Sequence, residues 1–220
     1  MKRKKKGYLA TLILCGILVA VLAVGGTLAW MTASTETKTN SFSVASGTMT
    51  ATLTEPAFTA TEQAKATKLK PGDVIMKNPT VTNTTAASDG TSEWVGLKLT
   101  FTKGDGTTQL NATEMALLMR VISYSINANW VGGAQSVGST DQNRTFYYSQ
   151  KLNAGGAATN PLFSSVNVLT TATNADLATI KDSWNGFKII INGGAVQGDI
   201  ASAWSGNETT IRTEIDALIP

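Results

Sequence analysis

The stretch WVGLKLTF, residues 94–101, carries the strongest fold signal in the chain. Its large apolar side chains fall at every second position: Val95, Leu97, Leu99 and Phe101. Successive side chains of a β-strand point to opposite faces of a sheet, so this spacing predicts a strand with one buried face. The same period-2 pattern recurs in TMTATLT (48–54), VISYSIN (121–127), RTFYYSQ (144–150) and FKIIING (187–193).

Segments rich in Gly, Asn and Asp separate these strands, and three other segments have helical spacing. The segment 111–120 begins with Asn111 and has Glu114 three residues later, which is the pattern of a capping box. Segments 174–181 and 207–218 are the other two helix candidates. Many short strands with a few short helices predict a mainly all-β chain folded as an antiparallel β-sandwich.

The composition excludes several kinds of catalytic and binding site. The 220 residues include no histidine and one cysteine, Cys15, so the usual zinc ligands and the usual proton shuttle are lacking. The sequence has no HExxH, CxxC, GxSxG or P-loop motif. We therefore predict that the protein is not an enzyme and has no catalytic residue, cofactor or metal ligand.

The chain begins with the layout of a secretory signal peptide. A basic start precedes the apolar stretch 8–24, and the small residues Thr27 and Ala29 then predict cleavage between Ala29 and Trp30. An uncleaved, membrane-anchored precursor is the alternative, because the apolar stretch reaches the lower length limit of a membrane-spanning helix. We expect residues 1–29 to be removed and the protein to be secreted to the extracellular matrix or the cell surface.

The charge of the exported part gives no sign of a nucleic-acid partner. Five of the 18 basic residues lie in the leader, so 13 basic residues remain against 15 acidic ones. Only Lys65, Lys68 and Lys70 lie near one another in the sequence. Nucleic-acid binding needs a clustered basic face, so we predict no nucleic-acid partner.

The exported part begins with a polar, Thr-rich stretch, residues 30–44. Such a stretch predicts an extended segment. We expect it to be followed by one β-sandwich domain, residues 45–220. The large apolar residues of the extended segment are Trp30, Met31, Phe42 and Val44.

Two motifs lie near the first predicted strands. The first is GGTLAW (25–30), followed by NSFSVASGTMTATL (40–53). The second is KLKPGDVIMKNPTVTNTT (68–85), in which a strand follows Leu69, Lys70, Pro71, Gly72 and Asp73. Together the two motifs resemble the TasA/camelysin family of exported bacterial proteins, whose leaders are cut by a SipW-type signal peptidase.

The resemblance implies a jelly-roll or Ig-like β-sandwich that serves as a structural subunit of extracellular biofilm-matrix fibres. In such fibres the first residues of one exported subunit add as a strand to the sheet of the next. The candidate donor strand lies within 30–44, and its apolar contacts would be Trp30, Met31, Phe42 and Val44. The implied partners are further copies of the same chain, other matrix components and, during export, the SipW-type signal peptidase.

Two other functions fit the sequence. A monomeric cell-surface or adhesion module would bind a glycan or a host protein, and some of the five tryptophans could then stack on sugar rings. In a β-sandwich without disulfides, large aromatic residues more commonly fill the core, and we predict that role for them here. A secreted hydrolase is the third alternative, because a fold can bring distant carboxylates together.

Overall fold

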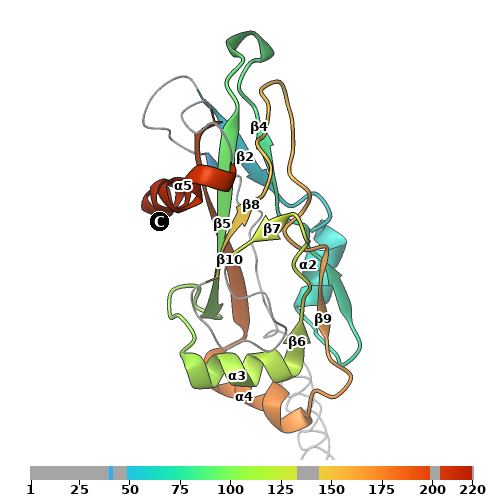
Figure 1. Ribbon diagram of the computed structural model, residues 1–220. Helices are drawn as coiled ribbons and strands as arrows, with labels where there is room; N and C mark the ends of the chain where they lie inside the picture. Colours follow the sequence, from blue (N-terminus) through green and yellow to red (C-terminus); the bar gives the residue numbers. More distant parts are fainter. Residues whose placement is uncertain (1–39, 42–48, 133–143, 199–203, 220) are drawn as a thin grey trace, which may run out of the picture.

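The computed structural model describes residues 40–41, 49–132, 144–198 and 204–219 (Figure 1). In this part of the chain, three antiparallel sheets form. The first sheet has the strand order β1 (Asn40–Ser41), β2 (Ala51–Thr54), β4 (Thr80–Asn83). The second has the order β10 (Phe187–Gln197), β5 (Glu93–Lys103), β8 (Thr145–Tyr148), β7 (Trp130–Val131). The third has the order β3 (Val74–Met76), β9 (Ser165–Val168), β6 (Ile122–Ser123). The prediction of a mainly β, antiparallel chain is therefore confirmed.

Short helices lie between the strands. They are α2 (Ala60–Ala66), the 3-10 helix η1 (Ala87–Asp89), α3 (Ala112–Val121), α4 (Asn174–Trp184) and α5 (Trp204–Leu218). The three predicted helices correspond to α3, α4 and α5, and α3 has the predicted capping box between Asn111 and Glu114. Helix α2 was not predicted from the sequence. No helix in the described ranges is long and apolar enough to cross a membrane.

The second sheet is built on its two long strands, β5 and β10. They pair along their whole length, from Glu93 opposite Gln197 to Lys103 opposite Phe187. The four residues that the sequence predicted to face inward on β5 are all buried, with at most 4% of their surface exposed. The period-2 pattern of WVGLKLTF therefore marks the core-facing side of the longest strand pair in the described structure.

One apolar core connects the three sheets. Leu53 and Val81 come from the first sheet, Leu97 and Ile189 from the second and Val166 from the third, and all five belong to one cluster of buried side chains. Helices α3 and α4 close one end of this core and lie side by side (Figure 1). They are tied by an ion pair of 2.6 Å between Arg120 and Asp176.

Helix α5 covers the outer face of the second sheet, and this contact was not predicted from the sequence. Ile211 and Ile215 of the helix pack with Trp94 in a second buried cluster. Gly96 and Gly194 lie opposite each other on β5 and β10, and a Cβ on Gly96 would come within 2.5 Å of Ile215. The two glycines therefore let α5 approach the sheet closely, and the adjoining part of β5 is buried on both faces.

Candidate functional site

The end of the candidate donor segment forms β1, the edge strand of the first sheet. Asn40 lies opposite Leu53 and Ser41 lies opposite Thr52, so β1 pairs antiparallel with β2 of the same chain. A strand edge offers unpaired backbone groups, and an extended peptide satisfies them by adding to the sheet. This part of the 30–44 segment therefore already takes the conformation that strand addition requires.

The remaining residues assigned to cleavage and donation lie outside the described residues. They are Ala29, Trp30, Met31, Phe42 and Val44. Their roles stay predictions.

The second sequence motif, Leu69 to Asp73, which carries the resemblance to the TasA/camelysin family and is called the family motif below, forms a tight turn at the start of β3. Asp73 N–H donates to Lys70 O at 3.0 Å, with Pro71 and Gly72 at the two central positions. Gly72 has φ of 91°, and proline followed by a residue with positive φ is the pattern of a type II turn. The Asp73 carboxylate also accepts from Lys70 N–H at 2.7 Å. The motif thus specifies a turn of the backbone. Its first residue, Leu69, packs against the main core.

Replacing Gly72 with alanine should destabilise the protein by about 1–2 kcal/mol, because the residue would keep a left-handed conformation. Steric overlap is a smaller factor, since the nearest atom to an added Cβ is Thr170 Cγ2 at 3.7 Å. Urea unfolding of the two proteins measures the difference. The exposed neighbour Lys68 provides a control, because Lys68→Ala should change stability by less than about 0.5 kcal/mol. Equal midpoints for wild type and Gly72→Ala would contradict the turn.

An apolar pocket lies beside this turn, between α2, the third sheet and the start of β10. Leu69 of the family motif forms part of its wall. Nine of the ten lining residues are apolar, and the exception is Lys77. The other wall residues are Phe58, Ala66, Ile75, Ile122, Val166, Val168, Phe187 and Ile189. Such a lining is suited to apolar side chains or to an apolar small molecule.

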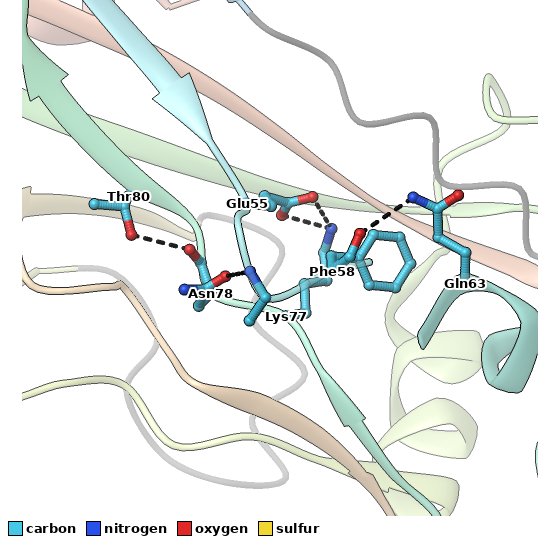
Figure 2. A network of polar contacts seen from close by, with 7 residues as sticks. Glu55, Phe58, Gln63, Lys77, Asn78 and Thr80 are labelled. Atoms are coloured by element: carbon cyan, nitrogen blue, oxygen red, sulfur yellow. Dashed lines mark hydrogen bonds and ion pairs between the residues drawn. The ribbon is translucent and has the colours of Figure 1, made fainter. Parts of the chain in front are cut away.

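Lys77 forms a buried ion pair with Glu55 (Figure 2). The Lys77 side chain is only 5% exposed, and its Nζ lies 2.6 Å from both carboxylate oxygens of Glu55. The same Nζ lies 4.8 Å from the centre of the Phe58 ring, a cation–π distance. Burial lowers the pKa of Lys77, and the opposing effect of the Glu55 carboxylate is smaller. The amine is therefore held in an apolar environment beside a single proton acceptor.

Glu62 covers the outer edge of β3. Its carboxylate accepts from Met76 N–H at 2.9 Å and from Lys65 Nζ at 2.6 Å. These hydrogen bonds, the one from Lys65 above all, lower the pKa of Glu62. One backbone N–H group at the edge of β3 next to α2 therefore has a hydrogen-bond partner within the chain. The side chains of Val74 and Met76 on this strand are exposed.

Glu93 is a buried carboxyl group at the start of β5. None of its surface is exposed, and neither carboxyl oxygen has a hydrogen-bond partner among the described residues. Burial raises the pKa of Glu93 to about 8. The side chain is therefore protonated at neutral pH.

The tryptophans in the described part fill the core, as predicted. Trp94, Trp130 and Trp184 are each at most 5% exposed. The side chains of Trp30 and Trp204 lie outside the described residues. None of the three described rings is available to stack on a sugar.

Sequence reasoning missed the ion pair and the helix beside it. Lys77 is two residues after Ile75, so it continues the inward-facing positions of β3. Thr59 accepts a hydrogen bond from Glu62 N–H, and Thr59 and Glu62 have the Thr-x-x-Glu spacing of a helix start. Both signals are present in the sequence, but the partner of Lys77 is 22 residues away and depends on the tertiary fold.

Comparisons of the chain with protein-family models, curated proteins and solved structures give no match. The resemblance to the TasA/camelysin family therefore rests on the two sequence motifs and stays a prediction.

Proposed function

We propose that the protein is a secreted, non-enzymatic structural subunit of extracellular biofilm-matrix fibres. The observation that supports this most strongly is β1, in which residues of the candidate donor segment pair with a sheet edge. Within one chain the described pairing covers only Asn40 and Ser41. The pairing of an edge strand can be exchanged for the equivalent pairing with another copy, which is the geometry of strand exchange.

In this proposal β2 of one subunit accepts the N-terminal strand of the next. The β2 edge supplies backbone hydrogen bonds to the donor. A head-to-tail contact of this kind does not close on itself, so it propagates as a filament.

The proposal also covers the type of β-sandwich and the export of the protein. The three sheets would form a jelly-roll or Ig-like sandwich, and a SipW-type signal peptidase would release the chain at Ala29. The main partners would be further copies of the chain, with other matrix components at the fibre surface.

Removing the donor segment tests the function. Protein purified after export should form filaments under the electron microscope, whereas a chain that starts after Val44 should stay monomeric because it has no strand to donate. A full-length control separates chain length from side-chain chemistry. Replacing Trp30, Met31, Phe42 and Val44 with serine should also prevent filaments, whereas replacing Thr32, Thr35, Thr37 and Thr39 with serine should not. Filaments formed by the shortened chain would refute donor-strand assembly.

A further inference from the structure

Lys77 has an environment that differs from that of an ordinary surface lysine. It is the one polar residue in the wall of the apolar pocket, and its side chain is 5% exposed. Lys77 directly follows β3, it is buried like Ile75 two residues before it, and both residues line the pocket. A lysine amine that is removed from water loses part of its preference for the charged form, and the neutral form is the nucleophile.

Glu55 supplies the acid–base group that a reacting amine requires. Its two oxygens are each 2.6 Å from Lys77 Nζ, so a proton can pass between the two groups without movement of the backbone. The same carboxylate cancels the charge of Lys77. An anionic ligand would therefore meet no net positive charge in the pocket, so a neutral apolar ligand fits better.

We propose that this pocket is a covalent capture site for apolar aldehydes, which react with the amine of Lys77. Glu55 takes a proton from the ammonium group, and the neutral Nζ attacks the carbonyl carbon. A C–N bond forms, and a proton passes from the nitrogen to the oxygen. Glu55 then returns its proton to the hydroxyl group, which leaves as water. The product is a protonated imine paired with the Glu55 carboxylate, so one ammonium group and one aldehyde give one protonated imine and one water without oxidation or reduction.

The walls of the pocket determine which aldehydes fit. Phe58, Leu69 and Phe187 present apolar surface to the chain of the ligand. Exclusion of water from such a surface also slows hydrolysis of the imine. Short polar aldehydes gain nothing from this surface and should react mainly with exposed lysines.

Reductive trapping tests the proposal on the protein purified after export. Limiting hexanal with sodium cyanoborohydride at pH 7 converts imines to stable amines, and peptide mass spectrometry identifies the labelled lysines. Lys77 should be labelled faster than the exposed Lys68 and Lys70, because burial lowers its pKa and leaves a larger fraction of its amine neutral. Burial alone predicts the opposite order, with Lys77 labelled last.

Two controls separate capture from general reactivity. Glyceraldehyde, which is polar, should label Lys68 and Lys70 in preference to Lys77. Glu55→Gln should slow hexanal labelling of Lys77, because the leaving hydroxyl group loses its proton donor even though the amine becomes neutral more readily, and it should leave Lys68 unchanged. If hexanal leaves Lys77 as the least labelled lysine of the folded wild-type protein, the pocket is not a capture site and the Lys77–Glu55 pair is structural.

Discussion

The protein should become less stable as the pH rises from about 4.5 to 8, because Glu93 must remain protonated in the folded state. Its folded pKa is raised to about 8 by burial, whereas an exposed glutamate titrates near 4.5. The contribution of Glu93 to the unfolding free energy is fully present below the pKa of the unfolded chain, near 4.5. It is lost as the pH rises through the pKa of the folded protein, about 8. A shift of this size corresponds to about 4–5 kcal/mol of unfolding free energy.

The neutral variant Glu93→Gln isolates this effect. Glutamine has nearly the same shape and stays uncharged, so the variant should match wild type at pH 5 and exceed its stability by roughly 3–5 kcal/mol at pH 9. Urea unfolding from pH 5 to pH 9 measures the difference between the two proteins at each pH.

Glu114→Gln provides a control of opposite sign. Hydrogen bonds from Lys103 and from Asn111 N–H lower the pKa of Glu114, so its contribution is present at neutral pH and is lost in acid. That variant should be less stable than wild type at pH 7, and the two should converge as the pH falls. A constant difference between wild type and Glu93→Gln from pH 5 to pH 9 would show that Glu93 does not titrate as described.

The second large effect concerns the ion pair in the apolar pocket. Lys77→Met should destabilise the protein at pH 7 by about 3–5 kcal/mol, because the buried Glu55 carboxylate loses its counter-charge. Glu55→Gln should cost less, because Lys77 already has a lowered pKa and can lose its proton. The double variant should recover most of the loss, since two neutral side chains leave no unpaired charge.

A double-mutant cycle measures the coupling. Urea unfolding of wild type, the two single variants and the double variant at pH 7 gives the interaction energy directly. A loss below about 1 kcal/mol for Lys77→Met at pH 7 would contradict the buried pair seen in the structure.

Local patterns in the sequence predicted most of the described secondary structure. The alternation around Leu97 located β5, and Asn111 with Glu114 located α3, because both signals depend only on nearby residues. The Ile211–Ile215 spacing likewise predicted a helix at the carboxyl end. This spacing could not predict that α5 covers the second sheet. The space for that contact comes from Gly96 and Gly194, which are almost a hundred residues apart in the sequence.

The candidate site was less predictable for the same reason. The family motif was visible as Pro71 and Gly72 before a strand, and its turn follows from their backbone preferences. The pocket beside the motif needs side chains from five parts of the chain, namely the region of α2 and the strands β3, β6, β9 and β10, and the ion pair of Lys77 needs a partner from before α2. Glu93 looked like one of several scattered carboxylates, because burial of a side chain depends on the finished fold.

A disulfide across the β1–β2 contact tests the central claim of strand exchange most directly. Ser41 and Thr52 lie directly opposite each other, and residues 30–220 contain no cysteine, so Ser41→Cys with Thr52→Cys introduces the sole pair of thiols. After assembly and oxidation, a denaturing gel without reductant should show a ladder of covalent multimers, because each strand pairs with the next subunit. Filaments whose chains all run as monomers on that gel, each closed by its own disulfide, would contradict the account.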